Sequence, residues 1–200
     1  MALRTAVIVA LAAMGLWQGY NNWRLGPLHP ADGVIAPDDP QQTALEEAPV
    51  TALGRWRLTP QARYDVTARI LSREDYHFDP LSDLIPEDLA LGWGPMSDNR
   101  VLRAFKITQG VRFYSWAPRQ ALPIPRQDVI EHSANTHVIP ASATVARQLK
   151  RLRVGQVVHL TGFLVNGVRD DGAYIRTSLT RSDTGPGSCE VLLVEQVEAW

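Results

Sequence analysis

Hydrophobic residues alternate with polar ones along several segments of the chain. In residues 62–71 (ARYDVTARIL), every second residue from the tyrosine onward is apolar, which predicts a strand with one buried face. Residues 156–165 (QVVHLTGFLV) are apolar on both faces, so this strand is expected to be covered on two sides, with Gly162 at a bend of the sheet. The segments VRFYSW, AYIRTSL and EVLLVEQV are shorter runs that also favour strands.

Helix signals interrupt these strands at three places. Pro86 is followed by two acidic residues and then by Gly92, an arrangement typical of a short helix from its first turn to its end. Ser97 or Asp98 can cap a second short helix. Residues 141–155 follow a proline, carry valine and leucine at helical spacing and end in a glycine, which predicts a third helix.

These elements together predict the fold class. A helix between strands, a long strand with a central glycine, and turn signals at Asn166-Gly167 and at residues 170–172 are typical of a small closed barrel. We therefore expect an α+β protein in which residues 55–200 form a small β-barrel-like (OB-like) domain with short helices.

Residues 1–24 differ in character from the rest of the chain. Arg4 and the terminal amine precede 19 uncharged residues, Thr5 to Trp23, whose length as a helix approaches the roughly 30 Å of a bilayer core. This segment predicts a transmembrane signal anchor and a single-pass protein of the bacterial inner membrane, with a cytoplasmic N-terminus and a periplasmic C-terminal domain. A signal peptide cleaved near residues 13–15 is the alternative interpretation.

Residues 25–54 connect this segment to the predicted domain. They contain five prolines and five acidic residues but few large apolar side chains. Such a composition buries too little apolar surface to offset the entropy lost on ordering, so an extended linker is predicted.

The net charge of −1 and the single cysteine restrict the possible functions. Proteins that bind nucleic acid usually carry a basic stripe, so no nucleic acid is expected as a partner. One thiol cannot form a disulfide within the chain, so the fold must depend on its core. The sequence predicts no cofactor.

The segment RSDTGPGSCE, residues 181–190, has three interpretations. Asp183-Thr184-Gly185 matches the loop of an aspartic protease, but that chemistry needs a second carboxylate, and no second such motif is present. The two glycines around the proline instead favour a tight turn between strands, with Asp183 bonded to nearby backbone. Cys189 precedes an apolar run, which favours a buried structural thiol over a catalytic nucleophile.

The segment HSANTH holds the densest group of polar side chains. His132, Ser133, Asn135 and His137 are candidate ligand-binding residues, and Asp183 and Trp93 are further candidates. His77, His132 and His137 are weak candidate metal ligands, because no established metal-binding spacing is present. The alternative is structural: the serine and asparagine would satisfy backbone groups where the chain approaches the helix.

Four blocks of the chain carry a resemblance. DLALGWGPMSD, RFYSW, SANTHVIPA and RSDTGPGSCEVLLVE are similar to the signature blocks of a family of short, membrane-anchored proteobacterial envelope proteins. The resemblance covers most of residues 33–197. It implies an envelope location and a one-domain architecture, and it implies no catalytic residues.

The sequence therefore predicts a non-enzymatic role. We expect a membrane-anchored periplasmic binding or assembly module that recognises an envelope protein or a cell-wall component, because no convincing catalytic set is present. The alternative is an envelope hydrolase or a metal-dependent enzyme that uses the His132–His137 loop.

Overall fold

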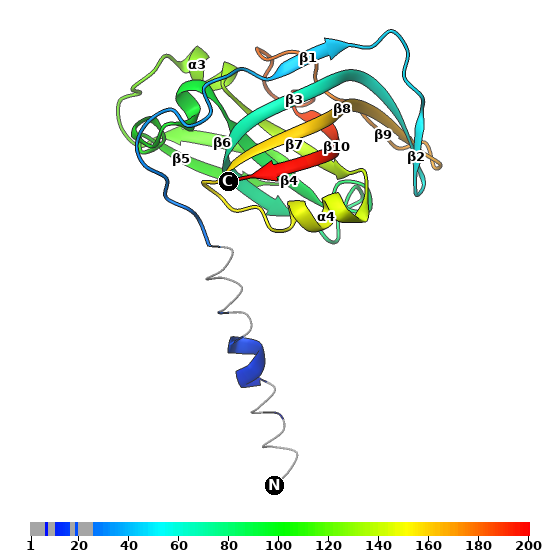
Figure 1. Ribbon diagram of the computed structural model, residues 1–200, viewed down its shortest axis with the longest axis horizontal. Helices are drawn as coiled ribbons and strands as arrows, with labels where there is room; N and C mark the ends of the chain where they lie inside the picture. Colours follow the sequence, from blue (N-terminus) through cyan, green and yellow to red (C-terminus); the bar gives the residue numbers. More distant parts are fainter. Residues whose placement is uncertain (1–6, 8–10, 17–18, 20–25) are drawn as a thin grey trace.

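The protein is built mainly from strands (Figure 1). A computed structural model describes Val7, residues 11–16, Gly19 and residues 26–200. One eight-stranded sheet has the order β1-β3-β4-β7-β10-β8-β9, with β2 paired to β3, and a separate hairpin joins β5 to β6. The strands are β1 (Gln41–Ala44), β2 (Thr51–Leu53), β3 (Trp56–Asp75), β4 (Glu87–Gly92), β5 (Phe105–Gly110), β6 (Phe113–Pro118), β7 (Ser133–Pro140), β8 (Val157–Arg169), β9 (Tyr174–Ile175) and β10 (Glu190–Ala199). The helices are η1 (Gly94–Ser97), α2 (Asn99–Leu102), α3 (Arg126–Glu131) and α4 (Ala143–Leu149).

The long strand β3 organises the sheet because it pairs with β4 along one part and with β8 along another. The pairings β3–β4, β4–β7, β7–β10, β10–β8 and β8–β3 form a cycle, in which only β7–β10 is parallel. Apolar side chains from these five strands and from α4 form the largest core cluster. Alternate residues of β3 point into it, as the period of two predicts: Tyr64, Val66, Ala68 and Ile70 are all buried.

The helix predicted after Pro140 is confirmed as α4. The side chain of Ser142 caps it by accepting a hydrogen bond from the backbone N–H of Val145, at 3.2 Å. Val145 and Leu149 then lie on one face of the helix and enter the core. The predicted cap at Asp98 is also present, where the side chain accepts a hydrogen bond from the backbone of Arg100 at 2.8 Å and starts α2.

A second layer covers part of the outer face of the sheet. The β5–β6 hairpin and α3 pack on β4 through Ala90, Phe105 and Val129, together with Met96 from η1. The hairpin turns at Val111 and Arg112, which both adopt positive φ angles of 51° and 66°. Residues other than glycine rarely adopt positive φ angles, so other contacts must hold the turn in place.

The described part of the predicted linker lies along the domain. The backbone N–H of Leu28 donates to the carbonyl of Val154 at 2.7 Å, and the Ser97 hydroxyl accepts from the backbone N–H of Ala36 at 3.2 Å. Ala36 is completely buried. Further along, β1 and β2 both pair with β3.

The predicted fold class is wrong. The described structure is mostly β-sheet with few helices, in one large mixed sheet, and not the predicted α+β combination of an N-terminal transmembrane helix with a small OB-like domain. Two incorrect predictions from the sequence explain the difference. The predicted helix after Pro86 is instead β4, whose six residues are all buried, and the proposed linker supplies β1 and β2. The turn predicted at Asn166-Gly167 is absent as well, because β8 continues to Arg169.

The predicted transmembrane anchor is also corrected. Most of residues 1–24 lie outside the described residues, and none of the helices that the structure describes is long and apolar enough to cross a membrane. The named α-helices have only 4 to 7 residues, or at most about 10 Å at about 1.5 Å per residue. The transmembrane helix, the single-pass inner-membrane and periplasmic location, and the membrane as a partner are therefore not retained.

Gly162 provides a test of the sheet's geometry. A Cβ atom there would lie 1.9 Å from the carbonyl oxygen of Leu193, on the strand that bulges between Val194 and Gln196. We expect Gly162→Ala to destabilise the domain by about 3 kcal/mol or more, because backbone cannot move aside cheaply. Gly110→Ala is the matched control, since nothing lies within 4 Å of its Cβ position. Urea unfolding of both variants measures the difference, and equal stabilities would contradict the close approach.

Candidate functional site

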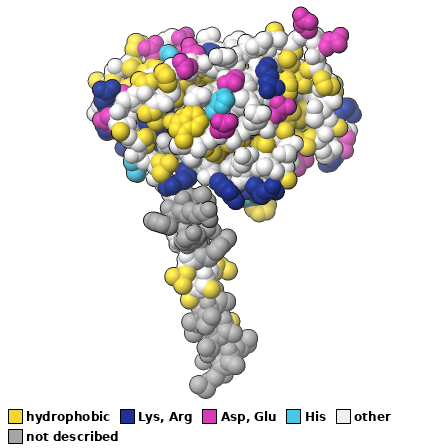
Figure 2. Space-filling view, viewed as in Figure 1, with side chains coloured by type: hydrophobic (Ala, Val, Ile, Leu, Met, Phe, Trp, Pro, Cys, Tyr) yellow, Lys and Arg dark blue, Asp and Glu magenta, His cyan; other side chains and the backbone are white. Residues whose placement is uncertain are grey.

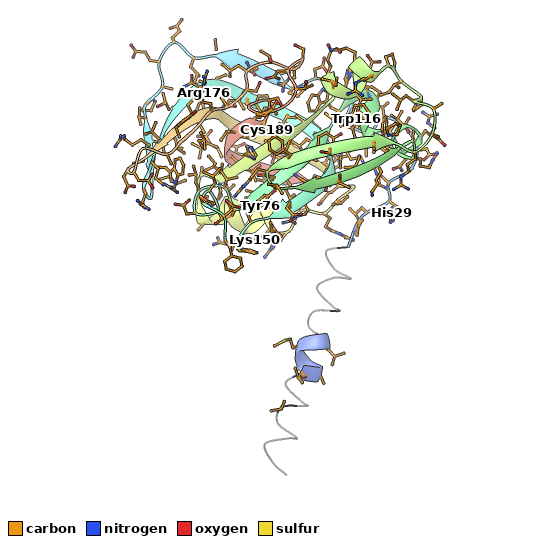
Figure 3. The ribbon with its side chains drawn as sticks, turned by 180° about the vertical axis from the view of Figure 1, so that it is seen from behind. His29, Tyr76, Trp116, Lys150, Arg176 and Cys189 are labelled. Carbon is orange, nitrogen blue, oxygen red and sulfur yellow. The ribbon has the colours of Figure 1, made fainter. Side chains whose placement is uncertain are left out.

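A cavity of about 440 Å³ opens between the β5–β6 hairpin, the start of β7 and the segment that precedes β10. The hairpin contributes Tyr114 and Trp116, and β7 contributes Asn135. Cys189 lies on its wall, near the middle of the face shown in Figure 3, where Trp116 is also labelled. Three segments that are far apart in the sequence therefore form one cavity.

A buried polar cluster adjoins this cavity. Asp88 of β4 is completely buried, and its Oδ1 lies 2.8 Å from Nδ1 of His137 on β7. Asn135, two residues earlier on the same face of β7, places its Nδ2 atom 3.4 Å from Oδ2 of Asp88 and 3.6 Å from Sγ of Cys189. The cluster thus brings a carboxylate, an imidazole, an amide and the only thiol of the chain together.

Arg112 closes the cluster from the hairpin. Its guanidinium donates to both carboxylate oxygens of Asp79 at 2.7 Å and to Oδ1 of Asp88 at 3.2 Å, and it lies 3.7 Å above the ring of Tyr76. The backbone N–H of Arg112 donates to the Tyr76 hydroxyl at 3.0 Å, and its carbonyl accepts from Asn135 at 3.2 Å. These contacts hold the turn that has positive φ angles.

The charge state of His137 follows from its neighbours. Burial alone would lower the pKa of the imidazole, but the hydrogen bonds to Asp88 and to the Cys189 thiol outweigh it and raise the pKa to about 9. At neutral pH the ring is therefore an imidazolium. It faces a buried carboxylate on one side and a thiol on the other.

Glu190 and Arg181 form a second polar group at the cavity. The Arg181 guanidinium donates to Oε1 of Glu190 at 2.9 Å and to the Tyr64 hydroxyl at 2.7 Å, and it lies over the ring of Trp93 at 5.5 Å. Burial raises the pKa of Glu190 to about 7, although Arg181 acts in the opposite direction. Glu190 therefore changes its charge close to neutral pH.

Two buried polar atoms on the cavity wall lack hydrogen-bond partners. Among the described residues, neither the indole N–H of Trp93 nor Oε2 of Glu190 has one. Both side chains are almost completely buried, and both neighbour the same Arg181 guanidinium. Because an unsatisfied buried polar group is costly, such a pair on one cavity wall indicates where a ligand could donate and accept hydrogen bonds.

The structure separates the residues that the sequence grouped together. Of the predicted ligand-binding residues, four line the cavity: Trp93, Ser133, Asn135 and Asp183. His137 belongs to the buried cluster beside it. His132 instead contacts the carbonyl of Asp128 at 2.8 Å at the end of α3.

The predicted metal site receives no support from this arrangement. His132 precedes β7 and His137 lies five residues later, which corresponds to roughly 16 Å of extended chain. His77 borders a different cavity, together with Glu87 and Lys150. Within residues 26–200 and the few described positions before them, no group of three or more His, Cys, Asp or Glu side chains is arranged to hold a metal ion.

The segment from Arg181 to Glu190 forms a turn and also lines the cavity. Asp183 is exposed and accepts a hydrogen bond from the hydroxyl of Ser178 at 2.7 Å, in place of the backbone amides that the sequence suggested. Gly185 and Gly187 both have positive φ angles of about 90°, which suits the predicted turn. Cys189 is buried, as predicted, but it contacts polar Asn135.

Sequence reasoning missed the charged residues of the site: Asp88, Arg112, Arg181 and Glu190. Asp88 was assigned to the first turn of a helix, which would have placed it in solvent. The signal that could have identified it is a pair of acidic residues next to the apolar run LALG, since a strand buried on both faces also buries its charges.

Charged side chains of both signs are mixed on one face of the domain. Figure 2 shows acidic and basic side chains intermixed over the front face of the domain, with basic side chains along its lower edge. No family model, curated protein or solved structure matches the chain. The candidate site therefore rests on geometry alone.

His137 should make the stability of the domain depend on pH. Its pKa in the folded protein is about 9, above the value of about 6.5 for an unfolded chain, so its stabilising contribution is complete below pH 6.5 and is lost as the pH rises through 9. We expect the difference in unfolding free energy between wild type and His137→Gln to shrink between pH 6.5 and pH 9.5.

Urea unfolding at several pH values measures this difference. Burial also raises the pKa values of Glu87 and Glu190, to about 8 and about 7, so both carboxyls lower stability as the pH rises. Glu87 acts equally in both proteins and cancels in the comparison. The imidazolium of His137 lowers the pKa of Glu190, so the Glu190 carboxyl loses less stability with rising pH in wild type than in His137→Gln; the comparison is therefore read above pH 8, where the wild-type carboxyl is already ionised. A difference that stays constant with pH would show that His137 carries no charge in the folded state.

Proposed function

We propose that this protein is a binding module that takes a polar ligand bearing amide groups, such as a peptide segment, into the cavity beside Cys189. The observation that carries the proposal is the pair of unpartnered buried atoms on the cavity wall, the indole N–H of Trp93 and Oε2 of Glu190. An amide group supplies a complement to both, because its carbonyl accepts a hydrogen bond and its N–H donates one.

The other walls of the cavity suit the same ligand. Trp93, Tyr114 and Trp116 offer aromatic surface, and the guanidinium of Arg126 lies 4.9 Å above the ring of Trp116. Ser133, Asn135 and Ser188 add short polar side chains at the wall. Ligand sites commonly combine aromatic surface with a few placed polar groups, because the former supplies affinity and the latter fix orientation.

Glu190 gives the binding a dependence on pH. With a pKa of about 7, its carboxyl accepts a hydrogen bond from a ligand N–H best above that pH, where it is ionised. Below pH 7 the protonated carboxyl can itself donate a hydrogen bond, which a ligand N–H cannot accept. The proposed ligand should therefore bind more tightly at pH 8 than at pH 6.

The test uses pools of N-acetylated, C-amidated tripeptides, with binding followed by saturation-transfer NMR and isothermal titration. Trp93→Phe removes the indole N–H while keeping an aromatic ring, and Glu190→Gln removes the titrating carboxyl. Each change should weaken peptide binding about tenfold or more, which corresponds to the roughly 1–3 kcal/mol of a buried hydrogen bond. The pH dependence should disappear in Glu190→Gln.

Trp56→Phe is the matched control. Trp56 is equally buried, but its indole N–H donates to Asp83 at 3.3 Å, and the residue does not line the cavity. This variant should lower stability and leave peptide binding unchanged. Binding that is equal in all three variants, or no binding by any pool to the folded wild type, would contradict the proposed function.

A further inference from the structure

The immediate surroundings of Cys189 are unusual for a buried structural thiol. A thiol that serves only as a small hydrophobic group is normally surrounded by apolar side chains. Cys189 instead lies 3.6 Å from the amide nitrogen of Asn135 and 4.0 Å from the carbonyl oxygen of Arg112, and it is close enough to His137 to contribute to the raised pKa of the imidazole. Its side chain also forms part of the wall of the 440 Å³ cavity, so a molecule in that cavity can reach the sulfur.

The imidazole is held in one orientation. Its Nδ1 atom lies 2.8 Å from Oδ1 of Asp88, which leaves the second ring nitrogen for other partners. Asp88 is in turn fixed by Arg112 and Asn135, at 3.2 Å and 3.4 Å. A buried carboxylate that orients an imidazole beside a nucleophile is the arrangement that activates cysteine and serine in enzymes from unrelated folds.

We propose that Cys189, His137 and Asp88 form a catalytic centre for acyl transfer, in which the thiol attacks a carbonyl group of the ligand in the adjoining cavity. Cys189 is the nucleophile, and His137 holds and transfers the proton. Asp88 is a positioning residue. This catalytic centre rests on the proposed function and extends it from binding to catalysis. The two are tested separately, because the reactivity of Cys189 can be measured without any peptide.

In the proposed centre the imidazole of His137 lies between the Asp88 carboxylate and the Cys189 thiol. Asp88 and the Cys189 thiol raise the pKa of His137, so the imidazole is protonated at neutral pH. The nucleophilic form of a cysteine is its thiolate, which a protonated imidazole stabilises during the attack. The charged and titratable groups around the imidazole are Asp88 from β4, Arg112 from the hairpin, Cys189 just before β10, and Glu190, the first residue of β10. Arg112 already shares the Asp88 oxygen that His137 contacts.

The reaction balances with water as the only co-reactant. The sulfur forms a bond to the carbonyl carbon, whose oxygen gains negative charge. The Asn135 amide nitrogen lies 3.6 Å from the sulfur, and in the proposed step it donates to that oxygen in place of the sulfur. The carbon–nitrogen or carbon–oxygen bond then breaks, and His137 gives its proton to the departing amine or alcohol. Water attacks the resulting thioester, His137 takes the proton from the water, and the thiolate leaves. The products are a carboxylic acid and the original centre.

The test uses the single thiol of the chain, because every alkylation event then reports on Cys189. Iodoacetamide labelling of the native protein is timed at pH 6 and pH 8.5, and the ratio of the two rates cancels the restricted access to a buried sulfur. In wild type this ratio should be close to one. In His137→Gln the thiol loses its imidazolium, so labelling at pH 6 should fall about tenfold or more relative to pH 8.5, as for an ordinary thiol that titrates near about 8.5.

His159→Gln is the matched control. This histidine also pairs with an aspartate, Asp65, at 2.9 Å on the same sheet, but it contacts neither Cys189 nor the cavity. Its labelling ratio should equal that of wild type. A ratio in wild type that already matches an ordinary thiol, or no native labelling at either pH, would overturn the proposal.

A second measurement covers the case in which His137→Gln does not fold. Wild type is mixed with p-nitrophenyl acetate, and intact-mass spectrometry follows the acetyl group on the protein. We expect one acetyl group on Cys189 that disappears with time as water hydrolyses the thioester, and no such adduct in Cys189→Ser. A wild type that never gains the group would refute acyl transfer. Peptide binding without labelling would leave the binding module intact and reject only the catalytic centre.

Discussion

A completely buried carboxylate, that of Asp88, is the constraint on which this site depends. An ionised group without solvent must be matched by nearby positive charge and hydrogen-bond donors, because its desolvation is otherwise prohibitive. Asp88 obtains them from Arg112, His137 and Asn135. These three partners come from two different elements, β7 and the β5–β6 hairpin, so satisfying one carboxylate fixes their relative positions. Removing any one of them leaves a charge that the remaining partners compensate less well.

The same constraint explains the strained turn of the hairpin. Val111 and Arg112 both have positive φ angles, which is unfavourable for residues with a side chain. Arg112 nevertheless contacts Asp79, Asp88 and the ring of Tyr76, and its backbone bonds to both Tyr76 and Asn135. In this conformation the guanidinium makes all of these contacts at once. The hairpin therefore closes over the polar cluster and, through Tyr114 and Trp116, forms one wall of the cavity.

The sequence was most informative where a single pattern controls the structure. The alternation in β3 and the capped helix α4 follow from local periodicity and capping, and both are present. The prediction from sequence failed where one local pattern is compatible with two structures. Pro86 with two acidic residues suits a helix start, but β4 is paired on both sides and buried on both faces, and tertiary pairing outweighed the helix signal. The fold class was wrong largely for this reason, and Asp88 was lost from the predicted site with it.

The local sequence also did not predict which single residues come together in the candidate site. Two histidines of HSANTH were grouped because they are close in sequence, yet His132 lies at the end of α3 and His137 lies in the middle of the extended strand β7. The partners of His137 are 49 and 52 residues away in the chain, at Asp88 and Cys189, and only the β4–β7–β10 pairing brings them together. A site whose residues come from different strands has no characteristic spacing in the sequence, because its geometry is set by the register of the strands.

The segment RSDTGPGSCE illustrates how turn chemistry and a reactive position can coincide. Gly185 and Gly187 take up positive φ angles that allow a tight connection into β10, and the Asp183 side chain ties the segment to Ser178. The consequence of this ordinary turn is that Cys189 and Glu190 enter the sheet at a fixed register, with Glu190 opposite Thr136 in the parallel pairing to β7. That register sets the thiol beside Asn135 and the carboxylate beside Arg181. A structural role for the turn and a chemical role for Cys189 are therefore compatible, because the first positions the second.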